Sequence, residues 1–266
     1  MSRWEELRNS TADKLREVNE RAARAAERSG RPADAVRVVA VTKYVEADRG
    51  FEAALFAAGC RDFGENRVAH LMDKWNALKE MSGKAGSDPP QPDPRRIRWH
   101  FIGSLQRNKV RRLLPYTALI HSIDTPELFA AVARIMREEN DPATRTYARE
   151  DALLPFPKRI PVLLEVNISG EGNKHGFQPE TFLEQAAPCF EQTGPVEIRG
   201  LMGMGGLESS PGEVRAQFAR LRELRDAARK AFPDADLAEL SMGMSGDFEL
   251  AIAEGATIVR IGSILY

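Results

Sequence analysis

The sequence is poor in cysteine, with only Cys60 and Cys189 among its 266 residues. The two lie far apart and in no metal-ligand or redox spacing, which excludes a disulfide framework and a cysteine-based zinc motif. The first thirty residues contain no apolar targeting segment, and no window approaches the roughly 18 uncharged apolar residues that a membrane span needs. We therefore expect a reduced, cytoplasmic protein without a membrane partner.

An excess of charge of either sign is also absent. The 38 Lys and Arg residues nearly balance the 39 Asp and Glu residues, so no strong field would attract nucleic acid or acidic lipid. The short basic run Arg107–Arg112 lacks the interleaved aromatic residues of a nucleic-acid site, and it suits a solvated helix face or an anion or partner surface. We expect no nucleic-acid partner.

The start of the chain has helical periodicity. Apolar and small residues recur at alternating steps of four and three from Trp4 to Ala25, and Gly30 and Pro32 would end the helix. Such a helix usually covers one side of a core, and binding of a partner is the alternative. We assign residues 1–31 to an amphipathic helix packed on a single domain that spans residues 32–266.

Eight apolar, β-branched runs follow, separated by segments with helical periodicity. They are Val36–Thr42, Arg61–Phe63, Arg98–Ile102, Ala118–Ile123, Ile160–Ile168, Glu197–Met202, Ala238–Met242 and Thr257–Ile264. Continuous apolar runs suit parallel strands buried on both faces, and eight strand–helix repeats close a barrel. A doubly wound open sheet is the alternative, but no run is followed by a G-x-G-x-x-G fingerprint. We predict an α/β protein with one (β/α)8 barrel of the TIM type and an added N-terminal helix.

Two stretches interrupt this alternation. Ser82–Arg96 is rich in Gly, Pro and Asp, and Asn140–Lys158 contains three prolines. Both are typical of surface insertions, and neither shows the change in composition that would mark a domain boundary.

Polar residues at the ends of the runs are the candidates for chemistry, because the working face of such a barrel lies at the carboxyl ends of its strands. Lys43 directly follows the first run. The barrel mouth can desolvate its amine and make it a Schiff-base nucleophile toward an aldehyde. A lysine whose stem lies along the strand end with its charge in water is the alternative.

A second polar group follows the last two runs. Gly243 and Gly262 let the backbone approach a ligand, and Ser245 and Asp247 precede a helix, which together suit an anion cradle for a phosphate group. Simple capping of that helix by Ser245 or Asp247 is the alternative. The residues alone leave both open, and a sugar-phosphate aldolase would use similar parts.

Six stretches carry a family resemblance, in one order along the chain. They are Val41–Lys43, Phe63–Asn66, Trp99–Gly103 with Leu105, Gln106, Asn108 and Lys109, Asn167–Ser169, Leu240–Ser245 and Val259–Gly262. Together they resemble the pyridoxal phosphate homeostasis protein family. The resemblance implies a single-domain barrel similar to the N-terminal domain of alanine racemase, with pyridoxal 5′-phosphate (PLP) as cofactor and no established catalytic turnover.

The same resemblance implies a set of cofactor-binding residues, with none assigned to catalysis or to a metal. They are Lys43, Asn66, Ser245, Arg260, Gly262 and Ser263. Lys43 would hold PLP as an internal aldimine, Arg260 would face the pyridine nitrogen, and Ser245, Gly262 and Ser263 would hold the phosphate. His100 would line the same mouth as Asn66. Lys174 would receive or release an aldehyde, unless it belongs to a plain solvated loop.

Three functions remain open at this point. The chain is a monomeric homeostasis protein that buffers PLP or delivers it to PLP-dependent apo-enzymes, a PLP-dependent racemase or other lyase, or a lysine-dependent aldolase. A cation facing the pyridine nitrogen disfavours ring protonation and weakens the cofactor as an electron sink. A racemase of this kind also needs a second acid or base, often tyrosine, and the chain has only four tyrosines. We predict a PLP carrier rather than an enzyme.

Overall fold

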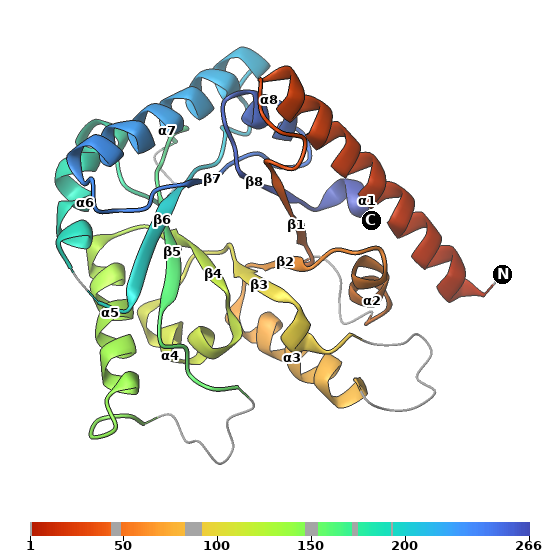
Figure 1. The fold of residues 1–266 in the computed structure, drawn as a ribbon, viewed down its shortest axis with the longest axis horizontal. Coiled ribbons are helices and arrows are strands. Elements are labelled where there is room, and N and C mark those ends of the chain that lie inside the picture. Colours follow the sequence, from red (N-terminus) through yellow and green to blue (C-terminus); the bar gives the residue numbers. More distant parts are fainter. Residues whose placement is uncertain (1, 44–48, 83–91, 147–153, 172–174, 193) are drawn as a thin grey trace.

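The computed structural model describes residues 2–43, 49–82, 92–146, 154–171, 175–192 and 194–266, apart from the side chains of Arg49 and Met81. Eight parallel strands close into a barrel in chain order, β1 to β8 (Figure 1). The strands are β1 (Arg37–Val41), β2 (Asp62–Glu65), β3 (Arg98–Phe101), β4 (Leu119–Ile123), β5 (Ile160–Glu165), β6 (Val196–Met202), β7 (Glu239–Ser241) and β8 (Ile258–Ile261). The predicted barrel is confirmed, and the open doubly wound sheet is excluded.

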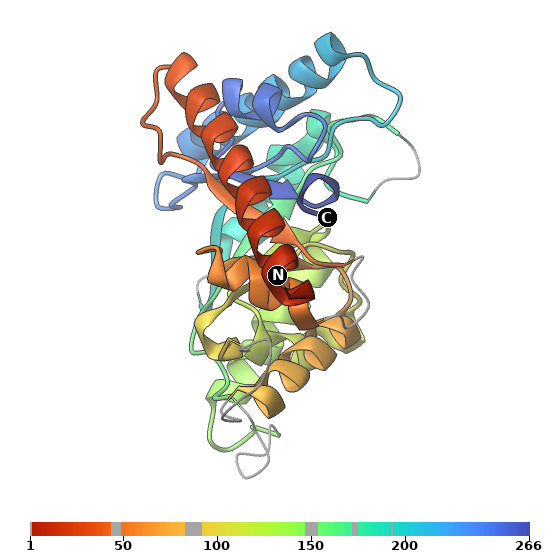
Figure 2. The same ribbon diagram turned by 90° about the vertical axis from the view of Figure 1, so that its right-hand side faces the viewer.

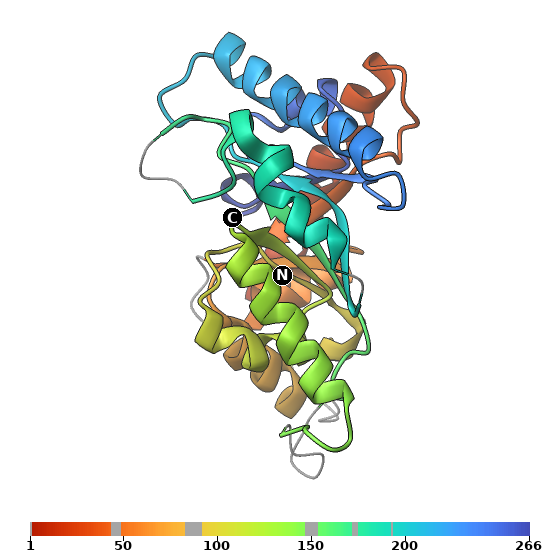
Figure 3. The same ribbon diagram turned by 90° about the vertical axis from the view of Figure 1, so that its left-hand side faces the viewer.

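Helices cover the outside of the barrel. They are α1 (Arg3–Arg28), α2 (Arg49–Ala57), α3 (Val68–Met81), α4 (Val110–Leu113), α5 (Pro126–Asn140), α6 (Phe182–Glu191), α7 (Pro211–Ala231) and α8 (Phe248–Ala253), with short 3-10 turns η1 (Pro94–Arg96), η2 (Arg107–Lys109), η3 (Leu114–Tyr116), η4 (Pro179–Thr181) and η5 (Ser263–Leu265). Helices α5, α6 and α7 pack in sequence against one another (Figure 3). Within the described ranges, none of the helices combines the length and apolar character that crossing a bilayer requires.

The N-terminal helix α1 is present where its periodicity predicts it. Ser2 and Glu5 form a capping box at its start, and Gly30 adopts a left-handed φ of 74° just after its end. Its buried face includes Leu15 and Val18, and the helix packs against α2 and α8 beside the C-terminal residues (Figure 2). Burial of this apolar face explains why the helix lies along the barrel.

Apolar packing is divided between the helix–barrel shell and the barrel interior. The shell holds the large buried side chains, among them Phe63, Trp99 and Phe101. A much smaller interior group consists of Val39, Leu119, Leu163, Met202 and Ile258, with Met204 packed against it. The buried side chains within the strands also include polar and charged ones, among them His100, His121, Ser241 and Arg260. The strands therefore bury polar groups in the core as well as apolar ones.

Two strands, β5 and β8, end three residues before their apolar runs do. β5 ends at Glu165, where the returning chain intervenes: the N–H of Phe177 donates to the Glu165 carbonyl at 2.8 Å. β8 ends at Ile261, because Gly262 (φ −122°, ψ −84°) leaves the strand and η5 begins. Both early ends leave polar groups at the carboxyl-terminal mouth of the barrel.

Candidate functional site

The carboxyl ends of β1, β7 and β8 meet at one edge of the barrel mouth. Lys43, which is partly buried, follows β1 by two residues. Gly262 follows β8 and lies against β1, since a Cβ atom built on it would be 3.5 Å from the Cβ of Val41. Ser245 reaches the same place from the loop after β7, and its hydroxyl oxygen accepts the N–H of Gly262 at 3.1 Å. The structure thus brings Ser245 and Gly262 together beside the strand that leads to Lys43.

The loop after β7 is shaped by close contacts rather than by helix capping. Gly243 has a φ of 93°, and a Cβ atom on it would be 2.6 Å from the Cβ of Ala251, so only glycine fits. Asp247 stands at the N-cap position of α8, yet its carboxylate accepts the N–H of Met244 at 2.5 Å instead of capping the helix. Gly246 has open space where a side chain would be. The capping alternative therefore does not account for Ser245.

Arg260 is a buried cation held by protein acceptors. Its Nη1 donates to the carbonyl oxygen of Ser241 at 2.8 Å and to the hydroxyl oxygen at 2.7 Å, and its Nη2 donates to the carbonyl of Gly203 at 3.2 Å. Its Nε makes no hydrogen bond to any described residue. Burial lowers the pKa of Arg260 to about 10, against the nearby charges of Glu165 and Asp247, which raise it. The guanidinium stays charged, and its Nε–H and the second N–H of Nη2 donate to none of the described residues.

Glu165 closes β5 and was not predicted as a site residue. Its side chain is almost wholly buried, and burial raises its pKa to about 7; the neighbouring Asp124 raises it further and Arg260 opposes the rise. The available signal was an acidic residue at the end of an otherwise apolar run. The Glu165 carboxyl group therefore has a pKa of about 7 and interacts with the charge of Arg260.

A buried ion cluster fixes the backbone just before Lys43. The ammonium of Lys74 lies 2.6 Å from the carbonyl oxygen of Thr42, 2.7 Å from Glu65 Oε1 and 2.8 Å from Glu52 Oε1. The Thr42 hydroxyl donates to Glu65 at 2.5 Å, and burial raises the pKa of Glu52. Because these groups come from α2, β2 and α3, no local sequence pattern could reveal that they meet.

Two other predicted cofactor residues, Ser263 and Asn66, also lie just after strand ends. Ser263 opens η5 and is exposed. Asn66 follows β2 and lines a cavity of about 340 Å³ together with Arg67, Lys109 and Arg112. Lys174 lies outside the described residues.

The prediction that His100 lines this mouth is wrong. Its Nε2 lies 2.9 Å from Oδ1 of Asp62, the first residue of β2, and it lines a cavity of about 620 Å³ with Arg37, Arg98 and Glu239. These partners begin their strands, so the cavity lies at the amino-terminal end of the barrel. The physical reason is that His100 falls inside its strand and is buried, where the Asp62 carboxylate accepts its ring N–H.

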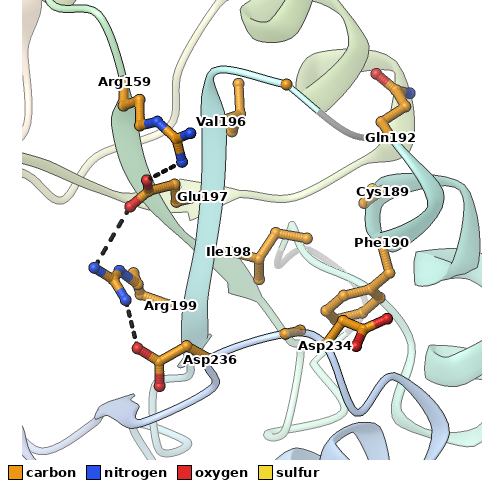
Figure 4. Close-up of a pocket in the computed structure, with 12 residues that line it drawn as sticks. Arg159, Cys189, Phe190, Gln192, Val196, Glu197, Ile198, Arg199, Asp234 and Asp236 are labelled. Atoms are coloured by element: carbon orange, nitrogen blue, oxygen red, sulfur yellow. Dashed lines mark hydrogen bonds and ion pairs between the residues drawn. The ribbon is translucent and has the colours of Figure 1, made fainter.

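A second cavity at this opposite end, of about 300 Å³, is bordered by paired charges (Figure 4). Glu197 links Arg159, at 2.8 Å, to Arg199, at 3.5 Å, and Arg199 also pairs with Asp236. Because these four charged groups pair with one another, we assign no ligand there. Among the residues that the structure describes, no three His, Cys, Asp or Glu side chains gather as a metal site.

The barrel and its mouth define a class of protein. The family model of the alanine racemase N-terminal domain matches residues 14–266. An alanine racemase from Clostridium difficile has the same fold, with a TM-score of 0.63 at 14% identity over 93% of this chain and 59% of that one. At this identity the likeness concerns the fold alone.

Closer relatives narrow the class. A pyridoxal phosphate homeostasis protein from Aquifex aeolicus is 36% identical over 259 residues, which are 97% of each chain. The structure of PipY from Synechococcus elongatus, described as having PLP bound, matches with a TM-score of 0.70 and 30% identity over 96% of this chain and 99% of that one. The chain belongs to the pyridoxal phosphate homeostasis protein family, as the motifs predict.

The raised pKa of Glu165 predicts a specific pH dependence for the cofactor-free protein. The carboxyl ionises near 4.5 when unfolded and near 7 when folded, so its contribution to stability is fully present below pH 4.5 and is lost as the pH rises to about 7. Glutamine cannot ionise, so between pH 5 and pH 8 the unfolding free energy of the wild type should fall by on the order of 2 kcal/mol more than that of Glu165→Gln.

Urea unfolding from pH 5 to pH 8 measures this effect. Glu223→Gln, at an exposed position on α7, is the matched control and should follow the wild-type curve. A Glu165→Gln curve parallel to that of the wild type would show that Glu165 ionises at its ordinary pH in the folded protein.

Proposed function

We propose that this protein binds PLP at the carboxyl-terminal mouth of the barrel and serves in PLP homeostasis, by buffering the cofactor or delivering it to apo-enzymes. Lys43 would hold the aldehyde end, Ser245, Gly262 and Ser263 the phosphate, and Arg260 the pyridine nitrogen, with Asn66 at the rim. The protein would act in the cytoplasm as a monomer, without catalytic turnover.

One observation carries the proposal: Gly262 touches both parts of the site. It packs against Val41, two residues before Lys43, and its N–H points to the hydroxyl of Ser245. The Ser245 hydroxyl accepts this N–H and keeps its own proton, which it would donate to a phosphate group beside the open space at Gly246. The relatives support the same ligand, since PipY has been solved with PLP bound.

The residues also fit the reactive end of the ligand. PLP supplies an aldehyde that forms an imine with a primary amine, with loss of one water molecule. The Lys74 cluster holds the carbonyl of Thr42 and so fixes the base of Lys43. Arg260 presents a cation, which disfavours a proton on a ring nitrogen and thus suits storage of the cofactor better than carbanion chemistry.

Replacement of Lys43 provides the first test. The wild-type protein incubated with PLP should show visible absorbance, and borohydride should fix the cofactor on the peptide that contains Lys43. Lys43→Ala should lose this covalent product yet keep its circular dichroism and melting temperature, because a lysine at a strand end serves binding rather than packing. Lys79→Ala, at an exposed site on α3, is the control and should label normally. A labelled peptide without Lys43 would contradict the assignment.

Transfer and turnover provide the second test. The loaded protein should activate a PLP-dependent apo-enzyme, and it should show no racemase, decarboxylase or transaminase activity above free PLP with a panel of amino acids. Enzyme reactivation, compared with an equal concentration of free PLP, and chiral chromatography measure the two parts. Saturable inversion of one amino acid that Lys43→Ala abolishes would instead establish a racemase.

A further inference from the structure

A continuous column of hydrogen bonds crosses the barrel interior from the cofactor mouth to the opposite end. Arg260 Nη1 donates to Ser241 Oγ at 2.7 Å, and Ser241 Oγ lies 2.8 Å from His121 Nδ1. His121 Nε2 lies 2.9 Å from His100 Nδ1, and His100 Nε2 lies 2.9 Å from Asp62 Oδ1. All five side chains are buried, so the column replaces solvent along its whole length.

The chemistry of the two ends, with two neutral imidazoles between them, fixes the order of the protons. A guanidinium can only donate, so Ser241 Oγ accepts from Arg260; a carboxylate can only accept, so His100 carries a proton on Nε2 and donates it to Asp62. A neutral His100 then accepts the Nε2 proton of His121 on its Nδ1. A neutral His121 in turn accepts the single proton of Ser241 Oγ on its own Nδ1, so that each link has one donor and one acceptor.

The charges around the two rings agree with this order. Burial lowers the pKa of His121 well below its usual value, and the charges of Arg260 and Arg37 act in the same direction, as would a proton on His100. Burial also lowers the pKa of His100; Asp62 opposes this change, whereas Arg37 and Arg98 reinforce it. Groups from β1, β2, β3, β4 and β8 thus face the pair, and their combined effect keeps both rings neutral at physiological pH.

We infer that His121 and His100 are positioning residues that aim Arg260 at the cofactor. Because His121 takes the only proton of the Ser241 hydroxyl, that oxygen keeps a lone pair directed at Arg260. The guanidinium is then held by Nη1 on Ser241 and by one N–H of Nη2 on Gly203, which leaves Nε–H and the second N–H of Nη2 as donors for the cofactor. This role rests on the proposed function, since it concerns the cofactor that Arg260 would face.

A pair of substitutions at position 121 separates positioning from packing. In His121→Asn the side-chain oxygen can still accept the Ser241 proton, whereas in His121→Phe nothing accepts it and the hydroxyl can turn its proton toward Arg260. Loss of one charge-assisted hydrogen bond corresponds to roughly a tenfold or greater weakening. We expect the dissociation constant for PLP to rise about tenfold or more in His121→Phe, with a shifted absorbance maximum of the bound cofactor, and to stay within about threefold of wild type in His121→Asn.

The cofactor-free wild-type protein gives a readout that does not depend on these variants folding. Nitrogen-15 NMR of the imidazoles should find both rings neutral, with the proton on Nε2, from pH 6 to pH 8. A charged ring at pH 7, or a proton on Nδ1 of either ring, would overturn the proton order. Equal PLP affinity and absorbance in folded His121→Phe and wild type would overturn the positioning role, whereas failure of the wild type to bind PLP would overturn the proposed function itself.

Discussion

The buried positive charge of Arg260 is the constraint on which the site depends. A guanidinium removed from water is costly unless its N–H groups find acceptors and opposite charges lie nearby. β7 supplies Ser241, the loop after β6 supplies the carbonyl of Gly203, and Glu165 and Asp247 supply negative charge. These partners come from the ends of the neighbouring strands β5, β6 and β7, so the order of strands in the barrel determines the electrostatics of the mouth.

The barrel interior meets this constraint with polar side chains. Among the described residues, the few buried side-chain atoms without a hydrogen-bond partner include none from the column between Arg260 and Asp62. A buried network in which every polar group has a hydrogen-bond partner holds its groups in one orientation, whereas a missing partner raises the free energy of the folded state. Apolar burial is concentrated in the helix–barrel shell, where Trp99 and Phe101 pack. The shell therefore stabilises the fold, which leaves the interior available for orienting charge.

The sequence was sufficient to predict the features that depend on local pattern, namely the strands and the residues that follow them. Apolar runs located all eight strands, and strand-end positions located Lys43, Ser245 and Gly262, because the mouth of a parallel barrel collects the residues that follow its strands. It did not reveal the Lys74 cluster or the column, whose members His121 and Ser241 are 120 positions apart. The prediction for His100 failed for the same reason. A motif shows which residues occur together in the sequence, but the end of the barrel that a buried side chain faces depends on its hydrogen-bond partner on the neighbouring strand, here Asp62.

The most direct test of this account is a crystal structure of the protein loaded with PLP. The account predicts that Nε or Nη2 of Arg260 lies within hydrogen-bonding distance of the pyridine nitrogen while Nη1 and Nη2 keep Ser241 and Gly203, and that the phosphate lies against Ser245 and Gly262. A guanidinium turned away from the ring, or released from Ser241 on loading, would contradict the claim that the interior of the barrel aims this charge at the cofactor.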